Sequence, residues 1–180
     1  MRHHLALHPL SRSEAIAEVE IEAAMIGAGL SLRYIATGST PGLKVAALSA
    51  PNRVDGLWRT TCFEAFVASA TTGAYYEFNF SPSTEWASYR FSAYREGMTP
   101  APETGEPDIQ TRLNAGRLEL QALVHLHRLE ALPAGAARHP AAPVVPRPAA
   151  GPFPTAARPV DPPPVGTTCP VSGTLAQPSL

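Results

Sequence analysis

Alternation of polar and apolar residues is the feature that most constrains what this chain can fold into. In "EVEIEA", residues 18–23, Val19 and Ile21 alternate with glutamates, and successive side chains of an extended strand point to opposite faces. The stretch "YYEFNFSPSTEWASYRF", residues 75–91, carries aromatic residues at alternate positions in a similar way. No stretch shows a convincing helical stripe of apolar residues. The pattern therefore predicts an all-β chain.

Turn signals separate the expected strands at intervals of about ten residues. The "GAG" at 27–29 can supply positive φ for a hairpin turn between 18–23 and the alternation that resumes at Leu30. Further strands are expected at 43–48, 61–68, 75–81, 86–94, 108–113 and 117–126. Many short strands with Pro, Gly, Asn and Asp clusters between them favour an antiparallel β-sandwich over a parallel α/β sheet.

Composition changes abruptly near Pro133. Seven of the 20 prolines lie in residues 1–132 and 13 lie in the remaining 48, which contain one acidic residue, Asp161, and no Trp, Tyr or Lys. Each proline removes a backbone donor, and little periodic apolar surface is left to offset the entropy of ordering. We therefore expect one β-sandwich domain over residues 5–132, and a disordered tail over 133–180 that does not extend a sheet.

The tail has a second interpretation. Ala, Pro, Gly and Arg make up 30 of residues 133–180, and all four can be encoded by GC-rich codons. A frameshifted GC-rich gene yields such a sequence, and so does a natural low-complexity tail. Composition leaves both interpretations open.

Charge and motifs exclude several classes of function. With 14 basic and 15 acidic residues and no run of either sign, the chain has no electrostatic footprint for nucleic acid or an anionic membrane. It has no apolar stretch of membrane-spanning length and no apolar run of signal-peptide length at its start, so we expect a cytoplasmic protein. Cys62 and Cys169 suggest no disulfide framework. The sequence motifs of common enzyme classes are missing, so we expect no catalysis.

Three stretches carry a resemblance to a known family: "DGLWRTTCFEAFV" at 55–67, the segment 75–91, and "YREGM" at 94–98. In these stretches the chain resembles the bacterial DOMON-like domain proteins, relatives of the family 9 carbohydrate-binding modules. The resemblance is fairly specific over 53–100, weaker from about 5 to 132, and absent beyond. It implies a β-sandwich of the jelly-roll type that binds sugars or, in other DOMON relatives, haem.

The chain departs from the family pattern at its end. Similar proteins continue with further strands rich in aromatic and acidic residues, where this chain has proline-rich sequence. That departure predicts a sandwich incomplete at its C-terminal side. It also leaves open a truncated or frameshifted protein with only a structural or interaction role.

The hairpin expected at 75–94 supplies the candidate binding residues. If its turn is "SPST", we expect the aromatic faces of the two strands to coincide in the core and the polar residues to share the other side. The candidate ligand-binding residues are Glu77, Asn79, Trp86, Arg90 and Tyr94, joined by Trp58 on a nearby loop. An aromatic beside carboxylate, amide and guanidinium suits sugar recognition. The alternative is a solvated sheet with a Glu77–Arg90 ion pair and a packed Trp86.

Three further features of the sequence lead to specific structural expectations. Glu64 sits among apolar neighbours, where a carboxylate needs a partner, and we expect a structural ion pair with Arg90 or Arg59. Haem would need axial ligands, and the candidates are Met98 with one histidine of the pair His125 and His127. The remaining clustered histidines are expected to bind metal only adventitiously, and they are His3, His4 and His8. No cofactor or metal is therefore assigned.

Overall fold

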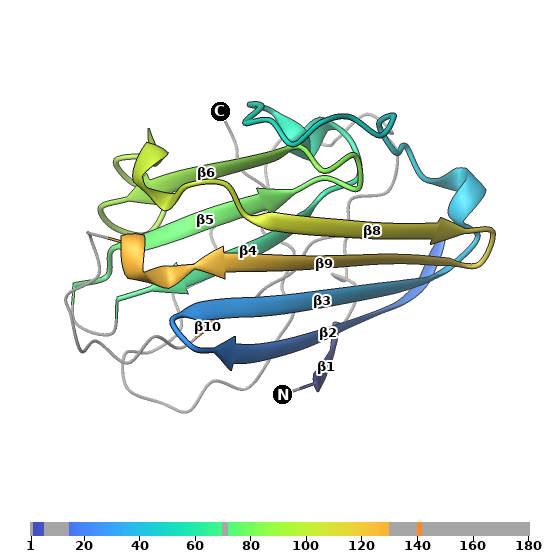
Figure 1. Ribbon diagram of the computed structural model, residues 1–180, viewed down its shortest axis with the longest axis horizontal. Helices are drawn as coiled ribbons and strands as arrows, with labels where there is room; N and C mark the ends of the chain where they lie inside the picture. Colours follow the sequence, from blue (N-terminus) through green and yellow to red (C-terminus); the bar gives the residue numbers. More distant parts are fainter. Residues whose placement is uncertain (1, 6–14, 70–71, 130–139, 142–180) are drawn as a thin grey trace.

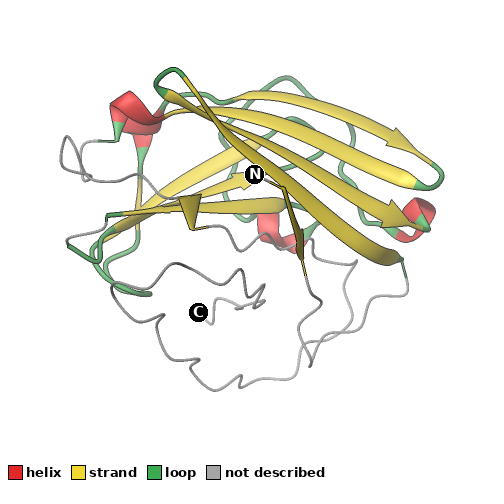
Figure 2. Ribbon diagram, turned by 90° about the horizontal axis from the view of Figure 1, so that it is seen from below, coloured by secondary structure: helices red, strands yellow, loops and turns green. Residues whose placement is uncertain are grey.

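In the part of the chain that the structure describes, ten strands form two antiparallel sheets that lie face to face (Figures 1 and 2). The computed structural model describes residues 2–5, 15–69, 72–129 and 140–141. Sheet A contains, in spatial order, β1 (Arg2–Leu5), β2 (Ile16–Ile26), β3 (Gly29–Gly38), β9 (Arg117–His125) and β8 (Asp108–Asn114). Sheet B contains β10 (Pro140–Ala141), β4 (Phe63–Ala68), β5 (Tyr75–Phe80), β6 (Trp86–Phe91) and β7 (Thr99–Pro100). The predicted all-β antiparallel sandwich is confirmed.

Four short 3-10 turns accompany the strands, and the described residues contain no α-helix. They are η1 (Thr40–Gly42), η2 (Leu57–Arg59), η3 (Pro102–Thr104) and η4 (Leu126–Arg128). Within the described part of the chain, no helix is long and apolar enough to cross a membrane. The cytoplasmic location stays a prediction.

The main core lies between the two sheets. Tyr34 of β3 stacks on Phe63 of β4, with 4.8 Å between ring centroids, and its hydroxyl donates to the backbone carbonyl of Glu64 at 3.3 Å. Complete burial raises the pKa of Tyr34 well above its usual range. Other large side chains buried in this core are Ile21, Leu30, Leu32, Phe78, Phe80, Leu118, Leu120 and Leu126. Removing their apolar surface from water is the main source of stability.

Sheet A follows the alternation of its sequence, with a dry inner face and a charged outer face. On the outer face, Arg33 Nε donates to Glu119 Oε1 at 2.7 Å and Arg33 Nη1 donates to Glu22 Oε2 at 3.0 Å. Hydrogen bonds from Arg2, and then from Arg33, lower the pKa of the Glu22 carboxyl. These pairs join β1, β2, β3 and β9 across the side of the sheet that faces solvent.

One expected strand does not form. Residues 43–48 have no strand structure, because they lie on the connection from β3 in sheet A to β4 in sheet B and no strand pairs with them. The Lys44 carbonyl accepts a hydrogen bond from the Thr61 backbone amide at 2.9 Å. Alternation over six residues therefore overpredicted a strand between Pro41 and Pro51.

The proline-rich segment contributes to sheet B, contrary to expectation. Pro140 pairs with Val67 and Ala141 with Phe66, so β10 extends the β4 edge of the sheet. Proline is tolerated at the first residue of an edge strand, where its missing N–H removes no ladder bond. Apart from these two residues, the predicted disordered tail lies outside the described residues. The predicted domain boundary near residue 132 stays a prediction.

Truncating a core leucine tests the position of the main core. Leu120 of β9 is fully buried, and Leu120→Ala should lower the free energy of unfolding by about 2–5 kcal/mol. The matched control is Leu113→Ala on β8, whose side chain is 51% exposed, and its cost should stay within about 0.5 kcal/mol. Urea denaturation measures both. Equal costs at the two positions would contradict the assignment.

Candidate functional site

The turn between β5 and β6 sets the register of sheet B. Phe80, the last residue of β5, pairs with Trp86, the first residue of β6. Between them, the Ser81 and Ser83 hydroxyls lie 2.7 Å apart, and Ser83 Oγ donates to Glu85 Oε2 at 2.8 Å. Ser81 and Ser83 are fully buried, so hydrogen bonds shielded from solvent stabilise the turn. Loop length in a hairpin decides which residues are opposite each other, and hence which share a face.

This register contradicts the expected arrangement of the polar residues. Glu77 pairs with Tyr89, and both point away from sheet A together with Asn79. Trp86 and Arg90 pair with aromatic residues of the main core and therefore lie on the side of sheet B that faces sheet A. The five candidates from this hairpin do not form one face, because a five-residue connection places even-numbered residues opposite even-numbered ones.

Trp86 is packed rather than presented to a ligand. Its side chain is 5% exposed, and the Arg53 guanidinium lies over its ring, 4.2 Å from the centroid. Arg53 Nη1 donates to Ser88 Oγ at 2.9 Å and to the Ser88 carbonyl at 3.2 Å, while Nη2 donates to the Ala101 carbonyl at 3.0 Å. Burial lowers the pKa of Arg53. The sequence alternative of a packed Trp86 is confirmed.

Arg90 and Tyr94 also lie apart from the expected site, and Glu64 lies on the opposite side of sheet B from its expected partner Arg90. Arg90 Nη1 is 3.4 Å from Glu103 Oε1, and both predicted ion pairs of Arg90, with Glu64 and with Glu77, are wrong. Glu64 is on the outer side of β4, and Arg90 is on the inner side of β6. Tyr94 follows β6 and is 43% exposed.

A second apolar cluster covers the side of sheet B that faces away from sheet A. The segment 54–62 crosses this side and packs onto it through η2. The Trp58 ring meets the Tyr89 ring edge to face, with 6.2 Å between centroids. Gly56, at φ 79°, adopts the left-handed conformation that leads the chain into η2. The buried members of the cluster are Leu57, Cys62, Ala87, Tyr89 and Phe91.

Polar groups lie beside this cluster in two hydrogen-bonded pairs. The Tyr89 hydroxyl donates to Asp55 Oδ1 at 2.8 Å, and Asn79 Nδ2 donates to Glu77 Oε1 at 2.9 Å. Burial, reinforced by the bond to Asp55, raises the pKa of Tyr89 above its usual range. Glu64 is opposite Asn79 in the β4–β5 register. Three carboxylates and an amide thus lie along one side of the sheet.

Aromatic rings continue the same side toward the other end of the strands. Tyr75 stacks on Phe91 with 4.5 Å between centroids and 6° between planes, and Phe66 lies 6.0 Å from Tyr75. Phe66, Tyr75, Glu77 and Trp58 are half-buried rather than enclosed. We call this side the outer face of sheet B, with the residues Asp55, Trp58, Glu64, Phe66, Tyr75, Glu77, Asn79, Tyr89 and Phe91. Its half-buried rings lie beside the Glu77 and Asp55 carboxylates, whereas Glu64, Asn79, Tyr89 and Phe91 are buried beneath them.

The haem candidates come from different sheets. Met98 is on the loop that follows β6 in sheet B and is 54% exposed. His125 ends β9 in sheet A, where its Nε2 lies 3.8 Å from Asp108 Oδ2. The His127 ring is 5.9 Å from that of His125, but the strand ends at His125 and His127 lies in η4, so the two do not share one strand as expected.

Comparison with known proteins supports the fold. The chain matches no protein-family model and no curated protein. It is similar to a crystal structure of a putative carbohydrate-binding protein from Bacteroides uniformis ATCC 8492, with a TM-score of 0.59 and 18% sequence identity. The likeness shows a shared fold. It covers 76% of this chain but 65% of that protein, slightly less than two thirds of its length.

Sequence reasoning missed five residues of the outer face of sheet B. Tyr89 and Phe91, on the aromatic face of the second hairpin strand, were assigned to the main core from alternation alone, and Asp55, Phe66 and Tyr75 were not singled out as binding residues. A signal was present in "WASYRF", 86–91, where Trp86 at an even position is apolar as well as Ala87, Tyr89 and Phe91 at the odd positions. Such a strand is buried on both sides, and its alternation cannot say which side faces the partner sheet.

The Arg53 contacts predict a measurable loss of stability. Arg53→Ala removes its bonds to Ser88 and Ala101 and its contact with Trp86, at a cost of about 1–3 kcal/mol in the free energy of unfolding. Arg112→Ala, an exposed arginine of β8, is the control and should be near neutral. Chemical denaturation measures the free energy of unfolding of both variants. A loss at Arg53→Ala as small as that at Arg112→Ala would contradict a stabilising role for Arg53.

The raised pKa of Tyr89 predicts how stability responds to alkali. A phenol whose pKa is higher in the folded protein contributes stability that is complete below about pH 10, the unfolded value, and is lost as pH rises toward the folded value. Tyr89→Phe removes this contribution, so its free energy of unfolding should fall less steeply above about pH 10. Urea denaturation from pH 8 to 11 gives the slopes. Identical slopes would show that the Tyr89 pKa is not raised.

Proposed function

We propose that the chain is a non-catalytic module that binds a carbohydrate on the outer face of sheet B. The observation that carries the proposal is the half-buried Trp58 ring beside two hydrogen-bonded polar pairs, Tyr89–Asp55 and Glu77–Asn79. Both the fold shared with the Bacteroides uniformis protein and the sequence resemblance to DOMON-like domains, relatives of family 9 carbohydrate-binding modules, support it.

The chemistry of this face suits a sugar ring. One side of a pyranose is lined with C–H groups, which pack on indole, phenol or phenyl rings, while its hydroxyls need acceptors and donors at the edge. Asn79 already donates to Glu77, which fixes the direction of that carboxylate before a ligand arrives. Tyr89 holds Asp55 in the same manner. Groups oriented in advance lose less entropy when a ligand binds.

The two alternatives receive no comparable support. Haem would need an axial ligand, and none of the described strands of sheet B carries a histidine or methionine. If the chain has a purely structural or interaction role, the outer face of sheet B binds no sugar.

Sugar binding can be tested with variants on the two sides of sheet B. Isothermal titration against a panel of mono- and oligosaccharides identifies a ligand, and Trp58 fluorescence should change when it binds. Trp58→Ala and Glu77→Gln should each weaken that binding by about tenfold or more, through a lost stacking surface and a lost charge-assisted hydrogen bond.

Arg90→Ala is the matched control. Arg90 was a candidate from the same hairpin, but its side chain lies on the inner side of β6 and pairs with Glu103, so affinity should be unchanged. If Arg90→Ala weakened binding as much as Trp58→Ala, the site would lie elsewhere. No binding across the whole panel would count against a carbohydrate ligand and favour a structural role.

A further inference from the structure

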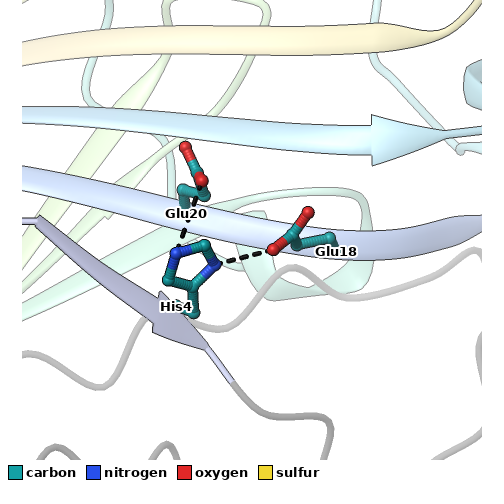
Figure 3. Close-up of side chains that lie close together, drawn as sticks. All are labelled: His4, Glu18 and Glu20. Atoms are coloured by element: carbon teal, nitrogen blue, oxygen red, sulfur yellow. Dashed lines mark hydrogen bonds and ion pairs between the residues drawn. The ribbon is translucent and has the colours of Figure 1, made fainter.

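A histidine and two carboxylates converge on the outer face of sheet A, whereas the proposed sugar site lies on sheet B. His4 of β1 lies between Glu18 and Glu20 of β2 (Figure 3). Its Nδ1 is 2.6 Å from Glu18 Oε1 and its Nε2 is 3.6 Å from Glu20 Oε1. Each residue offers one potential metal-ligand atom, and these three atoms lie within 4.8 Å of one another.

Backbone pairing holds the three residues in this arrangement. The antiparallel β1–β2 ladder places His4 directly opposite Glu20, and Glu18 is two residues away on the same strand, so its side chain points to the same side. Val19 and Ile21, which alternate with them, are buried in the main core. The cluster is therefore presented outward by a regular sheet.

Glu18 and Glu20 have fewer basic partners than the neighbouring glutamates on the outer face of sheet A. Glu22 is paired with Arg2 and Arg33, and Glu119 with Arg33 and Arg117. Among the described residues, His4 is the basic group that lies within ion-pair distance of Glu18 and Glu20. Two carboxylates facing one imidazole leave a net negative charge in either protonation state of the ring, which favours a cation at this position.

We propose that His4, Glu18 and Glu20 form a Zn²⁺ site on the outer face of sheet A. Zinc binds imidazole nitrogen and carboxylate oxygen at about 2.0–2.2 Å, so tetrahedral donor atoms lie about 3.3–3.6 Å apart. Glu18 faces Nδ1 of the His4 ring and Glu20 faces Nε2, so a metal bound by one ring nitrogen requires a side chain to turn. The three candidate ligand atoms lie within 4.8 Å of one another, and the exposed His4 and Glu18 side chains have room to turn. Water completes the coordination. Ca²⁺ and Mg²⁺ favour all-oxygen ligand sets, so the imidazole selects zinc over them.

Zinc bound here joins two strands. β1 is a four-residue strand at the edge of sheet A, and β2 is its only strand partner among the described residues. A metal bridging His4 to Glu18 and Glu20 fastens this edge to the sheet. Because the metal binds the folded arrangement, it also stabilises the folded chain.

The test uses full-length, untagged protein stripped of metal with a chelator and titrated with Zn²⁺ by calorimetry. We expect saturable 1:1 binding that is about tenfold or more weaker in His4→Gln and in Glu20→Gln. The control is His3→Gln, because His3 is opposite Ile21 and its side chain points to the other side of β1; its affinity should stay within about twofold of the parent. Circular dichroism verifies that each variant is folded.

Hydrogen exchange of residues 2–5 provides a second readout. Zinc should slow exchange of these amides in the parent protein and in His3→Gln, but not in His4→Gln. The proposal is overturned if the parent shows no saturable binding, if His4→Gln binds as tightly as the parent, or if His3→Gln loses binding equally. Each of these results can occur whether or not the chain binds a sugar.

Discussion

The register of the β5–β6 hairpin is the constraint on which the rest of sheet B depends. The connection of residues 81–85 is held by buried serine hydroxyls and makes Phe80 the partner of Trp86. A connection one residue longer or shorter would turn every side chain of β6 to the opposite side. With the observed register, Tyr89 lies on the outer face of sheet B and Trp86 beneath Arg53.

Sheet B is consequently buried on both sides, and the candidate site is a product of that packing. The main core forms between the sheets, while segment 54–62 adds a second, smaller cluster on the far side. Trp58 and Asp55 reach the site on this covering segment, whereas Glu77 and Asn79 reach it on β5. Rigid packing positions the polar groups, so a ligand meets a prepared surface rather than a mobile one.

How much the sequence could predict depends on how many sides of each sheet are wet. Sheet A has one charged face, so alternation predicted its long strands and placed residues such as Val19 and Glu22 correctly. Sheet B has no fully wet side, and the same reasoning assigned Tyr89 and Trp86 to the wrong sides. The predicted Glu64–Arg90 ion pair was wrong for the same reason, because the two residues lie on opposite sides of sheet B. The position of His4 beside Glu20 depends on pairing between distant strands, which periodicity cannot show.

Interstrand nuclear Overhauser effects between the backbones of β5 and β6 test the central claim most directly. The account predicts that Phe78 is opposite Ser88, with cross-strand contacts between their backbone protons. Contacts that instead place Phe78 opposite Tyr89 would shift the register by one residue. That result would return Trp86 and Arg90 to the side of Glu77 and contradict the site described here.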